Sequence, residues 1–136
     1  MSKGIPPVHK YMTTSPITIG HDQKIVKAEE IMHANRIRHL PVLKGGKFTG
    51  ILTDRDIKFV QGLRDLDAST LVVDDVVREQ AFTVDAESPL DQVASEMAEL
   101  KVGSAIVTQN GKLVGIFTTV DAMQALAELL RTRLGH

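Results

Sequence analysis

The chain has 136 residues, of which 43% are hydrophobic and 24% are charged, and its formal net charge is −1. This length favours one compact domain or two small halves that depend on each other. The near-neutral charge gives no electrostatic reason to expect a nucleic acid or an anionic membrane as a partner. The absence of cysteine excludes disulfides, thiolate metal sites and cysteine nucleophiles. Without an apolar signal region or a run long enough to cross a membrane, the sequence predicts a soluble, cytoplasmic protein.

The chain is an internal duplication. Residues 12–57 align with residues 77–122 without a gap, and a short lead-in precedes each copy, "VHKYM" at 8–12 and "VVDDVV" at 72–77. We therefore divide the sequence into repeat 1 (8–62), a polar linker (63–71) and repeat 2 (72–133). Identical pairs include Thr18/Thr83, Met32/Met97, Val42/Val107, Gly46/Gly111, Gly50/Gly115, Ile51/Ile116, Thr53/Thr118 and Asp56/Asp121.

Each repeat begins with a short β run, "PITI" at 16–19 or "AFTV" at 81–84, followed by a helix with one apolar face. Two further β runs flank Gly45-Gly46 and Asn110-Gly111, pairs that suit the positive φ angles of primed hairpin turns. A second helix then begins, ending near Gly62 as its C′ residue in repeat 1 and running from about Thr119 towards Arg133 in repeat 2.

The order is β-α-β-β-α, twice, which predicts an α/β (α+β) fold with approximate two-fold symmetry and two related clefts. The apolar stripes of the helices are expected to be buried and to pack the two halves together. The same expectation places the methionines in the core. The stripes concerned are Leu90, Val93, Ala94, Met97 and Leu100 in one helix, and Val120, Met123, Leu126, Ala127 and Leu130 in another; the methionines are Met12, Met32, Met97 and Met123.

Both copies contain the pattern Gly-apolar-apolar-Thr-x-x-Asp, as "GILTDRD" at 50–56 and "GIFTTVD" at 115–121. Each fits a capping box, in which the Thr begins a helix and the acid three residues later reaches back to the cap N–H. Capping alone accounts for both residue types. For an arbitrary protein it would be the favoured interpretation.

Three features favour a binding role for the same residues. The acid is Asp both times, although Glu is the usual partner in a capping box. A Gly lies inside each strand, where it weakens the strand unless another group must approach the backbone closely. A helix N-terminus suits a phosphate, and a short acid one turn later can accept hydrogen bonds from a ribose diol. Together these features predict a half-site for a nucleotide in each repeat.

The doubled unit, with "RIRHLPVLKGGKFTGILTDRDI" and its echo "KVGSAIVTQNGKLVGIFTTVDA", resembles a tandem pair of cystathionine β-synthase (CBS) domains, or Bateman module, from about Val8 to Leu130. The resemblance implies binding of adenosyl ligands (AMP, ADP, ATP or S-adenosylmethionine-like compounds) in two clefts between the repeats. It also implies a role as an energy or metabolite sensor, a homodimer, and an effector protein that the sequence does not identify.

Carried over by position, the resemblance assigns the ribose to Asp56 and Asp121 and the phosphate side to Thr53 and Thr118. One cleft would combine Thr118 and Asp121 with the strand entry of repeat 1, and the other would combine Thr53 and Asp56 with that of repeat 2. The starts of the first strands would offer backbone groups to the adenine. The strand entries are Ile37, Arg38 and His39 in repeat 1 and Gly103 and Ser104 in repeat 2, and the first-strand positions are Pro16, Ile17, Thr18, Phe82 and Thr83.

The two clefts are expected to be unequal. Repeat 2 has Ile106 where repeat 1 has Pro41, no cation at the positions of Arg38 and His39, and Val120 in place of Arg55. Cations that could meet a phosphate therefore come mainly from repeat 1. Arg38, His39 and Arg55 are equally compatible with an ordinary exposed location.

Three functions remain open at this stage. The first is a stand-alone regulatory module that binds adenine nucleotide as a regulatory ligand, with no catalytic cofactor and no chemistry of its own. The second is a protein-protein interaction or dimerisation module whose nucleotide clefts are vestigial. The third, an enzyme, has least support, because the sequence has no nucleophile elbow, Walker loop or dinucleotide fingerprint. The five histidines show no metal-ligand spacing, so no metal site is expected.

Overall fold

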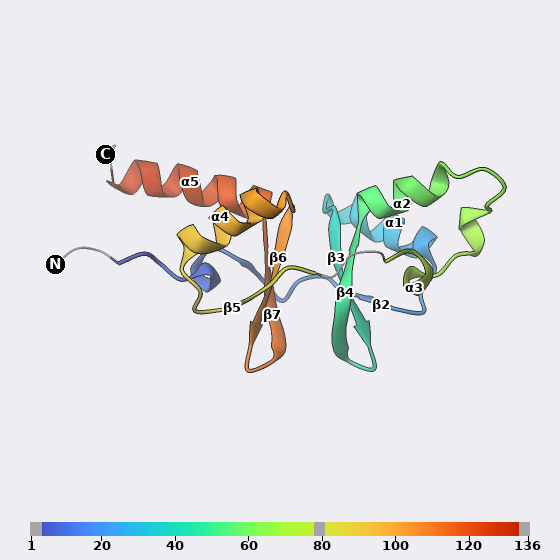
Figure 1. Cartoon of the computed structure of the whole chain (residues 1–136), viewed down its shortest axis with the longest axis horizontal. Coiled ribbons are helices and arrows are strands. Elements are labelled where there is room, and N and C mark those ends of the chain that lie inside the picture. Colours follow the sequence, from blue (N-terminus) through green and yellow to red (C-terminus); the bar gives the residue numbers. More distant parts are fainter. Residues whose placement is uncertain (1–3, 78–80, 134–136) are drawn as a thin grey trace. The chain divides into compact units, whose positions relative to one another are not determined.

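The computed structural model describes residues 4–77 and 81–133, and its elements follow the predicted β-α-β-β-α order twice (Figure 1). The chain forms two compact units. The repeat-1 unit consists of residues 17–81, and the repeat-2 unit combines the chain before Ile17 with the chain from Phe82 onward. The predicted fold class is confirmed in each unit. Within the described ranges, no helix is both long and apolar enough to cross a lipid bilayer.

The repeat-1 unit contains a three-stranded sheet in the order β2-β3-β4. Strand β2 runs parallel to β3, as expected for a strand, crossover helix and strand, and the β3–β4 hairpin is antiparallel. Its elements are β2 (Ile19–Gly20), α1 (Ile25–Asn35), β3 (His39–Lys44), β4 (Lys47–Thr53), α2 (Asp54–Gln61), a 3-10 turn η2 (Ala68–Thr70) and α3 (Val73–Val76).

The repeat-2 unit contains a four-stranded sheet in the order β1-β7-β6-β5. Strands β5 and β6 are parallel, β6 and β7 form the hairpin, and β1 adds an antiparallel strand at the edge of β7. Its elements are a 3-10 turn η1 (Val8–Lys10), β1 (Thr13–Thr14), β5 (Thr83–Asp85), α4 (Leu90–Leu100), β6 (Ser104–Gln109), β7 (Lys112–Thr118) and α5 (Thr119–Arg133).

The backbone conformation was predicted correctly for the two hairpin turns but not for the end of α2. Gly45 and Gly46 have φ angles of 58° and 80°, and Asn110 and Gly111 have φ angles of 53° and 77°, which confirms the primed turns. Gly62 has a φ of −85°. The expected left-handed C′ conformation is therefore not formed at Gly62, and α2 ends without needing a glycine there.

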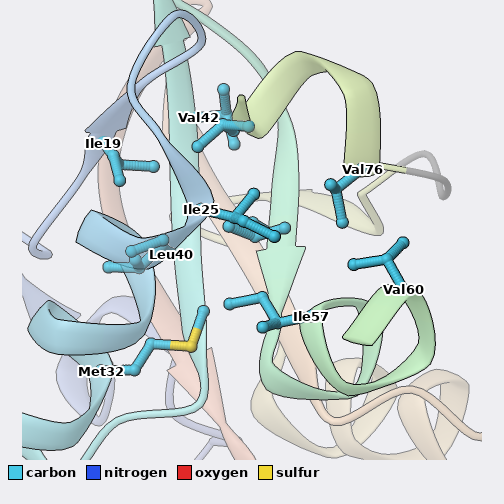
Figure 2. Close-up of a cluster of buried hydrophobic side chains, with 11 residues drawn as sticks. Ile19, Ile25, Met32, Leu40, Val42, Ile57, Val60 and Val76 are labelled. Atoms are coloured by element: carbon cyan, nitrogen blue, oxygen red, sulfur yellow. The ribbon is translucent and has the colours of Figure 1, made fainter. Parts of the chain in front are cut away.

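The two lead-in segments are exchanged between the repeats. Val8, at the start of the chain, is fully buried in the hydrophobic cluster of the repeat-2 unit, where its N–H donates to the carbonyl of Ser88 at 2.8 Å. Val73 and Val76, in the segment that precedes repeat 2, are buried in the cluster of the repeat-1 unit (Figure 2). Each core is therefore completed by the segment that precedes the other repeat in the sequence.

Most of the remaining core residues come from the first helix and the hairpin of each repeat, and the others come from the first strand of repeat 1, the segment after β5 and the second helix of each repeat. In the repeat-1 unit they lie around Ile25 of α1, with Met32 at one edge of the cluster in this view (Figure 2). The members are Ile19, Ile25, Ala28, Met32, Leu40, Val42, Leu52, Ile57 and Val60 in the repeat-1 unit, and Ala86, Leu90, Val93, Met97, Ala105, Val107, Phe117 and Ala125 in the repeat-2 unit.

The predicted burial of the α5 stripe is wrong. Val120 and Met123 are each 64% exposed, Leu126 is 50% exposed and Leu130 is 47% exposed. The helix packs against the core of its unit through Ala122, Ala125 and Leu129 instead. The two alanines are small and allow the helix to lie close to the sheet. Leu100, at the last turn of α4, is also exposed. Met123 is therefore a surface residue, while Met32 and Met97 are core residues as expected.

The strand glycines have a structural explanation within the chain itself. A Cβ atom built on Gly115 would lie 2.9 Å from the carbonyl oxygen of Thr13 and would clash with the side chain of Met12. This close approach occurs because β1 pairs with β7, with Thr14 opposite Gly115. At Gly50, the nearest atom to such a Cβ is a side-chain methyl of Val77, at 3.3 Å. Both glycines thus accommodate the exchanged segment of their unit.

We predict that Gly115→Ala destabilises the protein more than Gly50→Ala does. The first substitution meets a backbone oxygen, which cannot move without breaking the β1–β7 pairing, whereas the second meets a side chain that can shift. Overpacking of this kind costs about 1–3 kcal/mol, so we expect the two variants to differ by about 1 kcal/mol or more in the free energy of unfolding by urea. Equal losses would contradict this account of Gly115.

Candidate functional site

Both Thr-x-x-Asp motifs form capping boxes. In repeat 1 the backbone N–H of Thr53 donates to Asp56 Oδ2 at 3.1 Å, and the N–H of Asp56 donates to Thr53 Oγ1 at 3.1 Å. In repeat 2 the N–H of Thr118 donates to Asp121 Oδ2 at 2.9 Å, and the N–H of Asp121 donates to Thr118 Oγ1 at 3.3 Å. Each aspartate is 9% exposed, so a structural role in starting the helix is confirmed for all four residues.

The two aspartates differ in the number of hydrogen bonds that they accept. Asp121 also accepts hydrogen bonds from the hydroxyls of Thr118, at 3.2 Å to Oδ2, and Thr13, at 3.1 Å to Oδ1 and 3.3 Å to Oδ2. Among the described residues, Asp56 accepts only the N–H of Thr53. A carboxylate has about four acceptor positions, and donors from the described part of the chain occupy fewer of them on Asp56 than on Asp121.

Thr13 was not identified from the sequence. It lies in the lead-in of repeat 1 yet contacts the motif of repeat 2, because the lead-ins are exchanged. The repeat alignment gave no signal, since the corresponding position is Arg78 and the two residue types are unrelated. Arg78 lies outside the described residues.

Each motif lies beside the strand entry of its own repeat. His39 is opposite Thr53 in the β3–β4 register, and the N–H of Asp54 donates to the carbonyl of Arg38 at 3.0 Å. Repeat 2 reproduces this arrangement. There Ser104, which is buried, is opposite Thr118, and the N–H of Thr119 donates to the carbonyl of Gly103 at 3.1 Å. The combination of each motif with the strand entry of the other repeat stays a prediction.

The polar groups of the repeat-1 half-site include two cations and a half-buried histidine. Arg38 and Arg55 are exposed, and Ile37 packs against the edge of the core. Burial lowers the pKa of His39, with a smaller contribution from Arg38, while the carboxylates of Asp54 and Asp56 act in the opposite direction. Burial thus favours the neutral form of His39, while Asp54 and Asp56 favour its protonated form.

The residues that were predicted to offer backbone groups to the adenine lie in or just before the edge strands β2 and β5. Ile17 is exposed, and Pro16 and Thr18 are partly buried just before β2. In repeat 2 the carbonyl of Phe82 accepts the N–H of Ile106 at 2.8 Å, and Thr83 begins β5. One of the backbone acceptors assigned to the adenine is therefore already engaged in the sheet.

The described ranges contain no group of three or more His, Asp or Glu side chains placed to hold a metal ion. His9 and His21 instead lie near single carboxylates, with 3.4 Å between His9 Nε2 and Glu87 and 3.4 Å between His21 Nδ1 and Asp74. His136 lies outside the described residues.

Known proteins resemble this chain over nearly its whole length. The inosine-5′-monophosphate dehydrogenase of Korarchaeum cryptofilum is 26% identical over 134 residues, which are 98% of this chain but 27% of the enzyme. The chain thus spans about a quarter of the length of that relative. A Vibrio cholerae structure described as a candidate acetoin utilization protein (AcuB) is 27% identical, covers 96% of each chain and has a TM-score of 0.86.

A further neighbour shares the fold. The CBS domain pair of protein MJ0100, solved with 5′-methylthioadenosine and S-adenosylmethionine, is 24% identical, has a TM-score of 0.82 and covers 92% of this chain and 98% of its own. The sequence profile of the CBS domain matches this chain twice, at residues 8–61 and 73–128. The duplicated unit, the two capped motifs and these matches lead to one conclusion: the chain belongs to the CBS domain family, as a tandem pair.

Proposed function

We propose that this chain is a regulatory module that binds adenosine-containing ligands and reports their level to a protein partner. The observation that carries the proposal is the pair of buried aspartates, Asp56 and Asp121, each fixed at a helix start with a threonine beside it. A carboxylate in this position accepts hydrogen bonds from a diol, and the free N–H groups of the first helical turn suit a phosphate.

The capping role and the proposed binding role are compatible. The cap uses Oδ2 of Asp56, and among the described residues Oδ1 accepts no donor. A ribose hydroxyl could therefore add a hydrogen bond without breaking the capping box. Arg55 is exposed near the same helix start and supplies positive charge for a phosphate there, while Arg38, also exposed, would supply it in the cleft that the resemblance assigns to Asp121.

Relatives support the class of ligand and the absence of chemistry. The MJ0100 domain pair, which shares this fold, was solved with two adenosine compounds. The match to inosine-5′-monophosphate dehydrogenase covers only a quarter of that enzyme and coincides with the segments that the CBS profile matches. We therefore propose a regulatory ligand, with AMP, ADP, ATP and S-adenosylmethionine-like compounds as candidates, bound in the clefts that the family resemblance implies between the repeats.

We propose that ligand binding acts through a change in the equilibrium between two states of the module. A ligand shifts such an equilibrium only by its differential affinity for the two states. The two half-sites would contribute unequally, because Asp121 is engaged by the hydroxyls of Thr13 and Thr118, whereas among the described residues Asp56 accepts only the N–H of Thr53.

A thermal-shift panel of AMP, ADP, ATP, S-adenosylmethionine and 5′-methylthioadenosine tests the proposal directly. A ligand present at 100 times its dissociation constant stabilises the folded state by about 2.7 kcal/mol, which shifts the unfolding temperature by several degrees. GMP and CMP serve as controls for the base. No shift with any adenosine compound would favour the alternative, an interaction module with vestigial clefts, which the exposed apolar face of α5 also supports.

We predict that the double variant Asp56→Asn/Asp121→Asn binds the ligand found in this panel at least about tenfold more weakly, because hydrogen bonds to a charged group contribute about 1.5–3 kcal/mol each. The measurement is calorimetric titration. Asp75→Asn is the matched control, since Asp75 Oδ2 accepts the N–H of Val72 at 3.1 Å in the same capping geometry but lies outside the proposed site. Unchanged affinity in the double variant would refute the role given to these acids.

We predict opposite effects of pH on stability and on binding through His39. Because burial holds the pKa of His39 below its ordinary value, the unfolded chain takes up its proton first as the pH falls. The contribution of His39 to stability is therefore present above about pH 6.5 and is lost as the pH falls through the lowered pKa. A phosphate bound nearby would raise the pKa of His39, so binding of ADP should strengthen from about pH 7.5 to about pH 6.

The control for this prediction is His39→Ser, which introduces the residue found at the corresponding position, Ser104. This variant should show a flatter dependence of unfolding free energy on pH and lose the strengthening of ADP binding. The affinity for 5′-methylthioadenosine, which has no phosphate, should not depend on His39. A pH profile of ADP binding that is identical in the variant would exclude contact between His39 and the phosphate.

A further inference from the structure

The hydroxyl of Thr13 occupies the oxygen of Asp121 that the capping box does not use. The cap uses Oδ2 of Asp121, which accepts the N–H of Thr118 at 2.9 Å. Oδ1 accepts the hydroxyl of Thr13 at 3.1 Å, and the same hydroxyl lies 3.3 Å from Oδ2. In repeat 1 the matching oxygen, Oδ1 of Asp56, accepts no donor from the described residues. A hydroxyl of the chain itself therefore fills, in repeat 2, the acceptor at which we place a ribose hydroxyl in repeat 1.

The backbone of strand β1 sets the position of this hydroxyl. In the β1–β7 register Thr13 is opposite Ile116 and Thr14 is opposite Gly115. Because Gly115 has no side chain, the backbone of Thr13 can approach β7 closely. The side chain of Thr13 is short, so its hydroxyl reaches Asp121 only while β1 stays paired with β7. The hydrogen bond to Asp121 and the pairing of β1 are therefore coupled.

Strand β1 can leave the sheet without opening the core of its unit. It consists of two residues at the edge of the sheet, and both are exposed. Ser15 follows directly with a φ of 48°, in the left-handed region that is unfavourable for a residue with a side chain. Exposed segments with few contacts open at the lowest free energy in a folded protein. Val8, which closes the core, precedes β1 and does not have to move with it.

We propose that Thr13 is an internal competitor for the ligand at the Asp121 half-site, and that a ribose diol bound there replaces its hydroxyl. The competition rests on the proposed function, in which Asp121 accepts hydroxyl groups of an adenosine compound. Thr13 and the diol offer the same group, an O–H that donates to a carboxylate. A buried carboxylate that lacks donors is costly, and the replacement keeps Asp121 satisfied in both states.

The replacement connects ligand binding to the chain segment that joins the two units. Thr13 belongs to the repeat-2 unit, and the chain enters the repeat-1 unit at Ile17. A ligand that displaces the Thr13 hydroxyl removes one attachment of β1, so the segment between Thr13 and Ile17 gains freedom. The ligand then binds more tightly to the state in which β1 is detached. Such a difference in affinity between two states is what a regulatory ligand needs.

The first experiment isolates the Asp121 half-site and changes only the competitor. Asp56→Asn removes the charge of the other acid, and Thr13→Val is then added to this background. Valine keeps the branched shape that suits a strand and lacks the hydroxyl. The affinities for ADP and for 5′-methylthioadenosine are measured by calorimetric titration. Because the ligand no longer has to displace a hydrogen bond to a charged group, we expect Thr13→Val to tighten binding at least about tenfold.

Two matched variants separate the hydroxyl from other properties of β1. Thr13→Ser keeps the hydroxyl and should bind the two probes as the Asp56→Asn parent does. Thr14→Val makes the same chemical change at the next residue, whose side chain points to the opposite face of the strand, and should also leave the affinity unchanged. A purely structural role of Thr13 would lower the free energy of unfolding in Thr13→Val without tightening the binding of either probe.

The outcomes distinguish the competitor from the proposed function. If the native chain binds a probe but Thr13→Val does not tighten binding in the Asp56→Asn background, the competition is overturned and the proposed function stands. If neither probe binds to the native chain or to any Thr13→Val variant, the proposed function fails, and the competition fails with it.

The second experiment observes β1 itself. The chain has no cysteine, so Thr14→Cys carries a single spin label on β1. We expect the label to become more mobile on addition of ADP or 5′-methylthioadenosine, and to keep its mobility on addition of 2′,3′-dideoxyadenosine, which lacks the diol. The control is a label at Lys112→Cys, at the exposed start of β7, which should not respond to any of the three. A Thr14→Cys label that stays equally immobile with a saturating diol ligand would contradict the displacement of β1.

Discussion

Everything else in this fold depends on the exchange of the two lead-in segments. A repeat of this size is marginal on its own, because a domain of about 60 residues buries only about 60% of the surface that its unfolded chain exposes. Val8 closes one core, and Val73 and Val76 close the other. The backbone approach at Gly115 and the contact of Thr13 with Asp121 both follow from this exchange. The glycines and part of the candidate site therefore have their origin in chain connectivity.

The geometry of the Thr-x-x-Asp motif caps a helix and is also compatible with the ligand-binding role that we propose. A helix start needs acceptors for its unpaired N–H groups, and Thr and Asp supply them. The same acceptors, when not saturated, can meet hydroxyl groups of a ligand. The copies have diverged in how far they are saturated, since Asp121 accepts two hydroxyl donors that Asp56 does not accept from the described residues. Under the proposed function, such divergence would give the two half-sites different properties on one framework.

The sequence predicted local structure well where the structure depends on residues close together in the sequence. The hairpin turns at Gly45-Gly46 and Asn110-Gly111 and the caps at Thr53 and Thr118 were all identified from spacing and residue type. The buried face of α1 followed from periodicity, and so did Leu90, Val93 and Met97 of α4, whereas Ala94 and Leu100 of the predicted α4 stripe are exposed. Prediction failed where the burial of a side chain depends on which distant part of the chain packs against it. The stripe from Val120 to Leu130 has the periodicity of a core helix, but Ala122 and Ala125 pack more closely and leave it outside. Thr13 was missed because its partner is 108 positions away in the sequence.

The exchanged connectivity also sets an order of events during synthesis. The repeat-1 unit is one continuous stretch of chain, and its last buried core residue, Val76, leaves the ribosome before the core residues from Ala86 to Ala125 do. Domains generally fold as units while synthesis proceeds, so this half can complete its core first. The segment around Val8 must wait, since its binding place is built by residues that are translated last. For that interval the apolar side chain of Val8 has no core to pack into.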